Sequence, residues 1–212
     1  MIKSLVALMA GLTFSGAVMA AGIVEGKDYQ VIDQPMKSEA PANKIEVTEV
    51  FWYGCPHCYA LEKPLNEWVA TLPDDVEFDR MAAPLGKVWE QHAKAFYAAK
   101  SLGIEHEMRQ DFMDAIHKQG KRLTDEDDIA EFFTHYGVTK EQALKALDSF
   151  GVKSQIQQAV AKMRSYQLMG VPDLIVDNHY VVTPDSAGSL ENMPKIASAL
   201  IEKVREERQE AK

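Results

Sequence analysis

Hydrophobic and polar positions follow two different periods along this chain. Near its start, a short apolar segment at 29–32 and a longer one at 45–53 are rich in β-branched and aromatic residues, which is typical of buried strands. From Pro56 onward apolar residues recur at three- and four-residue intervals, and proline suits the first turn of a helix. Residues 76–81 alternate between apolar and polar positions. The first part of the chain is therefore predicted to fold as strand, strand, helix and strand.

The middle of the chain has an almost entirely helical pattern. Strand character returns at 174–182, where Asp177-Asn178 is a hairpin signal between two short strands, and a last helix is predicted from Ser189 to the C-terminus. Strands on both sides of a helical block predict an α/β domain with helices inserted into it. The five predicted helices of that block are 88–101, 105–118, 125–135, 139–149 and 152–167.

The first twenty residues have the pattern of a secretory signal peptide. Lys3 gives a positive start, an apolar stretch follows, and small residues flank a predicted cut after Ala20. The stretch is shorter than the roughly 20 residues of a membrane span, so a retained anchor is the weaker interpretation. We therefore expect an exported protein.

Composition narrows the class of protein. Without residues 1–20 the chain has 22 basic and 32 acidic residues, a net charge of −10, and we expect no nucleic-acid partner. About 190 remaining residues suffice for one domain carrying an insertion.

The only two cysteines, Cys55 and Cys58, lie between a predicted strand and a predicted helix. A disulfide closed across two residues constrains little of the chain, which disfavours a purely structural bond. Free N–H groups and the dipole at the helix start favour thiolate, and His57 could add positive charge or simply be exposed. A thiol with a lowered pKa favours the reduced form, so its disulfide is oxidising. The pair therefore predicts a donor of disulfides.

Other chemistry of the cysteine pair is less well supported. Zinc usually needs four ligands, and a second cysteine or histidine pair at zinc spacing is missing from the sequence. Haem attachment needs histidine directly after the second cysteine, where the chain has Tyr59. We expect no metal and no cofactor. A binding protein or chaperone with incidental cysteines stays an alternative.

Two further residues stand out. Glu49 interrupts the apolar strand six residues before Cys55; if buried, its pKa would be raised and it could exchange protons with the cysteine pair, and otherwise it faces solvent. Pro172 leads into the predicted hairpin. The residues alone favour a trans peptide bond there, although a cis bond is possible.

These features resemble the thioredoxin superfamily, and within it the DsbA family of exported thiol:disulfide oxidases of Gram-negative bacteria. Cys55-Pro56-His57-Cys58 is similar to the active site of that family, and Phe51-Trp52-Tyr53 and Gly170-Val171-Pro172 also fit. Pro172 follows Cys58 by 114 positions, far more than in a plain thioredoxin, so the helical block resembles the insertion of this family.

The resemblance implies a thioredoxin-like fold with an inserted all-helical domain. The thioredoxin-like domain would comprise 21–86 and 168–212, the insertion 87–167, and the signal peptide 1–20. A lowered cysteine pKa and an oxidising disulfide are already known for this family, so our inference about the cysteine pair agrees with a known case.

The resemblance also implies roles for single residues and for partners. Cys55 would be the exposed nucleophile and Cys58 the buried resolving thiol. Val171 would pair with a substrate peptide beside a cis-proline at Pro172. The remaining implied site residues are Pro56, His57 and Glu49, with Arg80 as a basic partner of Glu49.

The implied protein is a periplasmic monomer that oxidises reduced, unfolded exported proteins and is reoxidised by a DsbB-like, quinone-linked membrane protein. A disulfide isomerase or reductase is the alternative within the same class. Known exported isomerases resemble this unit fused to a dimerisation domain, for which 21–44 are too few residues.

Overall fold

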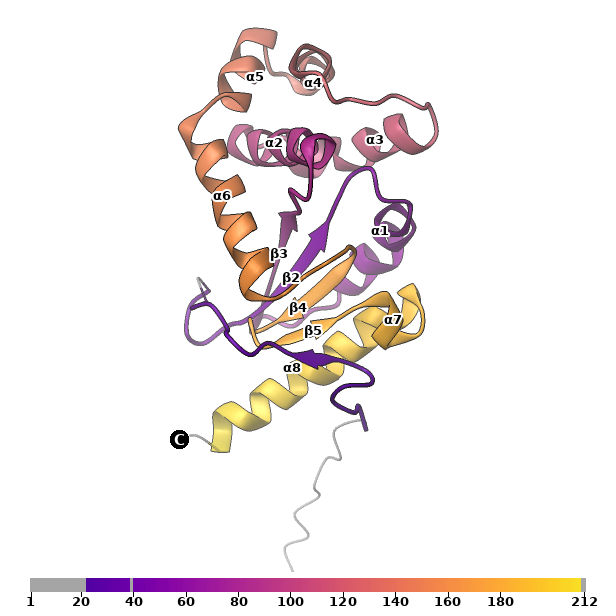
Figure 1. Ribbon diagram of the computed structural model, residues 1–212, viewed down its shortest axis with the longest axis vertical. Helices are drawn as coiled ribbons and strands as arrows, with labels where there is room; N and C mark the ends of the chain where they lie inside the picture. Colours follow the sequence, from indigo (N-terminus) through magenta and orange to yellow (C-terminus); the bar gives the residue numbers. More distant parts are fainter. Residues whose placement is uncertain (1–21, 39, 211–212) are drawn as a thin grey trace, which may run out of the picture.

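Figure 1 shows the computed structural model, which describes residues 22–38 and 40–210. The predicted signal peptide and its cut after Ala20 lie outside the described residues. A sheet occupies the lower half of the molecule, one group of helices lies above it, and a long C-terminal helix crosses beneath it.

Within the part of the chain that the structure describes, the sheet has five strands in the order β1-β5-β4-β2-β3. Only β2 and β3 are parallel, and the other neighbouring pairs are antiparallel. All seven residues of β2 are buried, as expected for a strand in the interior of a sheet. The strands are β1 Gln30–Val31, β2 Ile45–Phe51, β3 Val76–Ala82, β4 Asp173–Val176 and β5 Tyr180–Val182.

Helices α1 (Pro56–Val69) and α8 (Met193–Glu210) cover one face of this sheet. Leu61 and Leu65 of α1 and Leu200 of α8 are fully buried in one cluster with strand residues such as Val47. Because α1 begins where β2 has just ended, this packing fixes the start of α1 at the end of a central strand.

Helices α2 to α6 lie between β3 and β4 in the chain. Most of the block stands above the sheet in Figure 1, and α6 descends along its left side to reach the sheet. One hydrophobic cluster joins Phe51 of β2 to Phe96 and Phe112 in the block. The division into two domains stays a prediction. The helices are α2 Lys87–Leu102, α3 Glu105–His117, α4 Glu126–Phe133, α5 Lys140–Leu147 and α6 Phe150–Ser165.

The order of the strands and long helices predicted from the sequence is confirmed. The prediction that the last helix begins at Ser189 is wrong. The segment from Ser189 is not one helix: a short 3-10 helix, η2 (Leu190–Asn192), precedes α8. An additional short helix, α7 (Pro184–Ala187), comes before it; Thr183 caps α7, and Gly188 ends it in the left-handed conformation.

The hairpin between β4 and β5 forms at the predicted turn. Asp177 and Asn178 have φ values of 53° and 55°, and the N–H of His179 donates to the carbonyl of Val176 across them. Because Val176 pairs with Tyr180, the loop has three residues, one more than the tightest hairpin turn. The buried Asn178 side chain accepts a hydrogen bond from the Tyr166 hydroxyl and donates one to Glu46.

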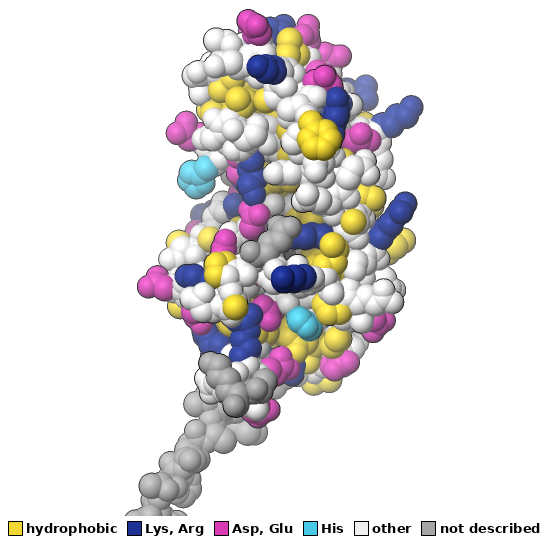
Figure 2. Space-filling view, turned by 90° about the vertical axis from the view of Figure 1, so that its left-hand side faces the viewer, with side chains coloured by type: hydrophobic (Ala, Val, Ile, Leu, Met, Phe, Trp, Pro, Cys, Tyr) yellow, Lys and Arg dark blue, Asp and Glu magenta, His cyan; other side chains and the backbone are white. Residues whose placement is uncertain are grey.

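The surface over α5 and α6 carries acidic and basic side chains close to one another (Figure 2). Mixed charge of this kind suits a protein that stays in solution. Among the described residues, no helix is long and apolar enough to cross the membrane.

Candidate active site

The turn after β2 brings Cys55 to the start of α1. The N–H of Cys55 donates to the carbonyl of Trp52 at 3.0 Å, which closes the turn. Gly54 is required there, because a Cβ at this position would lie 2.4 Å from the Trp52 ring. Pro56 occupies the first turn of α1, where no N–H is needed. The local sequence therefore places the first cysteine at the N-cap of a helix.

The two thiols are free and both are buried, so the expectation of an exposed Cys55 is wrong: Cys55 is 7% exposed and Cys58 is fully buried. Their electrostatic environments are opposite. A hydrogen bond from the Cys58 thiol lowers the pKa of Cys55 to about 6, against the effect of burial, and the N–H groups of Cys58 and His57 and the charge of His57 add to the lowering. Burial raises the pKa of Cys58 far above its ordinary value, and the charges of Cys55 and Glu49 add to that rise. At neutral pH the pair therefore holds a thiolate at Cys55 and a neutral thiol at Cys58.

The loop before β4 lies against this pair. The peptide bond between Val171 and Pro172 is cis, so the trans bond favoured by the residues alone is wrong and the cis bond implied by the resemblance is confirmed. The Cys55 sulfur lies 3.6 Å from the carbonyl oxygen of Val171. Two segments more than 110 residues apart in the chain thus meet at one sulfur.

The other two residues of the motif face outward. Pro56 and His57 are both exposed. His57 acts on Cys55 through its backbone N–H and its positive charge, and its ring lines a groove beside the cysteines.

Glu49 is fully buried, so the solvent-facing alternative is wrong. Its Oε2 accepts hydrogen bonds from Arg80 at 2.7 Å, the expected partner, and from Arg109 at 3.2 Å. Its Oε1 has no hydrogen-bond partner among the described residues. Burial raises the pKa of Glu49, and the two arginines oppose that rise. A buried carboxyl with one unsatisfied oxygen is suited to binding and releasing a proton.

The sequence interpretation missed two members of this network. Glu62 of α1 accepts two hydrogen bonds from Arg109 of α3, both 2.8 Å long. Burial opposes ionisation of Glu62, but the charge and hydrogen bonds of Arg109 leave its pKa lowered. A signal did exist: Glu62 lies one turn after Cys58, and Arg109 one turn before the buried Met113, so both are charged residues on apolar helix faces.

A groove of about 970 Å³ lies beside the cysteines. His57 contributes to one side of it, the segment 166–171 to another, and residues of α7 to a third. Asp173, which the sequence interpretation also missed, lines the groove directly after the cis-proline and is only 5% exposed. His57 and Val171, which both border Cys55, are thus shared between the groove and the cysteine pair.

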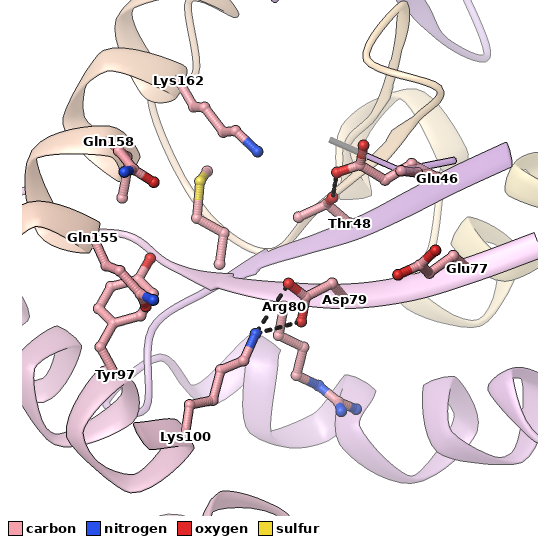
Figure 3. A pocket seen from close by; sticks show the side chains of 13 residues that line it. Glu46, Thr48, Glu77, Asp79, Arg80, Tyr97, Lys100, Gln155, Gln158 and Lys162 are labelled. Atoms are coloured by element: carbon pink, nitrogen blue, oxygen red, sulfur yellow. Dashed lines mark hydrogen bonds and ion pairs between the residues drawn. The ribbon is translucent and has the colours of Figure 1, made fainter. Parts of the chain in front are cut away.

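A smaller cavity of about 210 Å³ lies beneath α6. Figure 3 shows Lys162 pointing into it and Lys100 paired with Asp79, whereas the Arg80 side chain leaves on the other side of β3. Side chains alternate along a strand, so Glu46 and Thr48 face this cavity and Glu49 faces α1. The cavity is thus separated from the cysteine pair by the sheet. Within the described parts of the chain, no group of three or more His, Cys, Asp or Glu side chains is arranged to hold a metal ion.

A low-pKa thiol at a helix start, a buried partner thiol and a cis-proline, on a thioredoxin-like fold, define a thiol:disulfide oxidoreductase. The model of the DSBA-like thioredoxin domain matches residues 76–200. The thiol:disulfide interchange protein DsbA of Pseudomonas syringae is 42% identical over 94% of this chain and 93% of its own length. The protein of the same name from Azotobacter vinelandii is 39% identical over 91% of this chain and 90% of its own length.

Solved structures agree with these relatives. The crystal structure of Pseudomonas aeruginosa DsbA has a TM-score of 0.83 at 39% identity, and covers 88% of this chain and 96% of that one. The oxidoreductase DsbA from Xylella fastidiosa has a TM-score of 0.80 at 32% identity, with 86% and 97% covered. The chain belongs to the DsbA family. It is a thiol:disulfide interchange oxidoreductase.

Proposed function

We propose that this protein is a periplasmic oxidase that donates its Cys55–Cys58 disulfide to newly exported proteins. The observation that carries the proposal is the contrast between the two thiols: the pKa of Cys55 is lowered to about 6 while that of Cys58 is raised. A stabilised thiolate lowers the free energy of the reduced form, so the disulfide form gives up its bond readily.

The first step is attack by a substrate thiolate on the Cys55 sulfur. A bond forms between the substrate sulfur and Cys55, and the Cys55–Cys58 bond breaks with its electron pair going to Cys58. Because Cys58 is fully buried and its thiolate is disfavoured, it must gain a proton as it leaves. Glu49 is the proposed proton donor, since it is buried near enough for its charge to act on Cys58.

The second step releases the product. A second substrate thiolate attacks the first substrate sulfur, forms the substrate disulfide and expels Cys55 as a thiolate. The low pKa of Cys55 makes it a good leaving group. Two substrate thiols are oxidised, and the enzyme is left with two reduced cysteines.

Substrate recognition is proposed at the cis-proline loop. The backbone of Val171 and Pro172 would align an extended peptide beside Cys55 in β-fashion, which selects for main chain rather than for one sequence. Such tolerance suits an enzyme that oxidises many unfolded proteins.

The remaining features of the proposal come from family membership. They are export to the periplasm with removal of 1–20, a monomeric state, a discontinuous thioredoxin-like domain at 21–86 and 168–212 with a helical insertion at 87–167, and reoxidation by a DsbB-like, quinone-linked membrane protein.

The proposal is tested with the oxidised protein and a reduced, unfolded substrate that has two cysteines. We expect wild type to generate the substrate disulfide and the Cys55→Ala variant to generate none. The matched variant Cys58→Ser keeps the Cys55 thiol but cannot form the internal disulfide, so without an added oxidant it too should generate no substrate disulfide. Full oxidase activity in Cys55→Ala would contradict the proposal.

A further inference from the structure

Asp173 is a buried acid without a charged partner among the described residues. The residue is only 5% exposed, and its side chain makes no hydrogen bond or ion pair with any other described residue. Burial alone raises its pKa, to about 7. Buried carboxylates are normally paired or hydrogen-bonded, because an unpaired charge in the interior is costly. A group of this kind calls for a partner from outside the chain.

The position of Asp173 indicates where that partner would come from. Its side chain lines the groove beside the cysteines, two residues after Val171, whose carbonyl contacts the Cys55 sulfur. Successive residues of an extended peptide are about 3.3 Å apart. A peptide aligned along Val171 with its cysteine at Cys55 would therefore bring a residue about two positions away to Asp173.

The other charged or titratable groups of the groove are few. Lys27 comes from the segment before β1, His57 from α1, Tyr166 from the end of α6 and Asp185 from α7. Lys27 and Asp185 are exposed, and neither forms an ion pair with Asp173. Asp173 is thus the buried acid of a groove whose other charges lie at its rim.

We propose that Asp173 is a specificity-determining residue, which receives a lysine or arginine side chain of the substrate about two residues from the cysteine being oxidised. The inference rests on the proposed function, because it assumes that substrate peptides bind along Val171. A cationic side chain of the substrate would pair with the Asp173 carboxylate, which has no charged partner among the described residues. The enzyme would remain tolerant of sequence elsewhere along the peptide and prefer basic residues at this point.

The test uses the oxidised wild-type protein and three reduced peptides that differ only in having Lys, Gln or Glu two residues from a single cysteine. The rate of reduction of the Cys55–Cys58 disulfide is measured for each peptide. Every rate is divided by the rate of the same peptide with a neutral small disulfide, which removes the effect of the neighbouring charge on the peptide thiol. We expect the Lys peptide to react about tenfold faster than the Glu peptide, as for one charge-assisted hydrogen bond.

Two variants that each lose one negative charge distinguish a specific effect of Asp173 from an effect of the net charge of the protein. In Asp173→Asn the Lys-over-Glu ratio should fall to about twofold or less. In Asp128→Asn, which removes an exposed acid of α4, the ratio should stay as in wild type. Replacing a buried residue such as Asp173 can impair folding. The Lys-over-Glu ratio is therefore also measured as a function of pH in wild type, where no variant is needed. It should rise as pH increases through about 7, where Asp173 loses its proton.

The outcomes distinguish the two levels of the proposal. Equal reactivity of the three peptides with wild type, or a ratio that survives Asp173→Asn and disappears in Asp185→Asn, would overturn the role of Asp173 while leaving the oxidase function intact. Failure of wild type to react with any peptide thiol would overturn the proposed function and this inference with it.

Discussion

Glu49 provides a test of the mechanism at the scale of one residue. In Glu49→Gln the side chain keeps its shape but has no acidic proton to give to Cys58. We expect substrate oxidation at pH 7 to slow by about 100-fold, as is typical when a general acid is lost. Stopped-flow measurement of mixed-disulfide formation checks this.

Two controls separate proton transfer from structural damage. Glu62→Gln changes a carboxyl in the same network that is not among the groups acting on Cys58, so its rate should fall much less. The pKa of Cys55, measured by thiolate absorbance, should stay near 6 in both variants, because it is set by burial and by groups of Cys58 and His57, which both variants keep. Equal slowing in the two variants would show that the network acts only structurally.

Arg109 connects three elements of the fold, so its replacement should weaken the packing of a strand and two helices at once. From α3 it donates to Glu49 of β2 and to Glu62 of α1, and it is 4% exposed. Arg109→Met would leave the two buried carboxylates with Arg80 alone. We expect a loss of about 3–5 kcal/mol in the free energy of unfolding at pH 7, the usual cost of breaking a buried ion pair.

The pH dependence of that loss has a definite sign. The lowered pKa of Glu62 gives wild type stability that is present above the ordinary glutamate pKa and is lost as pH falls through the folded-state value. The gap between Arg109→Met and wild type should therefore narrow at acid pH. Urea unfolding of the oxidised proteins measures it. The surface pair of Arg205 and Asp75 is the control, since Arg205→Met should cost less than about 1 kcal/mol at either pH.

These elements show which features a sequence can predict. Strand β2 and the turn at Asp177-Asn178 follow from neighbouring residues, so pattern and turn chemistry are enough to locate them. The Glu62–Arg109 pair joins residues 47 positions apart, and only packing of α1 against α3 brings them together. Likewise the chemistry of Cys55 followed from its motif, whereas the isolation of Asp173 depends on the groove around it.

At the scale of the whole molecule, the helical block and the sheet meet around the active site. Besides Arg109, the Tyr53 hydroxyl donates to Glu105 at 3.2 Å and the Tyr59 hydroxyl to Asp114 at 2.7 Å, both on α3. The residues that flank the cysteines are thus fixed by hydrogen bonds to the block. The groups that stabilise a thiolate at Cys55 are in place only in the folded protein, so the redox state is linked to the free energy of unfolding.

That coupling predicts how stability depends on redox state and pH. Cys55 has a pKa of about 6 when folded and about 8.5 when unfolded, so between these values the unfolded reduced chain binds more protons than the folded one. The stability of the reduced protein relative to the oxidised protein should therefore rise with pH across this window, by about 1 kcal/mol at pH 7, and the increment should vanish below pH 6. Asp173 titrates nearby, but it does so in both redox forms and cancels from the difference. Thermal unfolding of both forms at several pH values measures the effect, and reduced Cys55→Ser, which has no thiolate at this position, should lack it. The same pH dependence in that variant would assign the effect to another group and remove the thiolate as the source of the oxidising power.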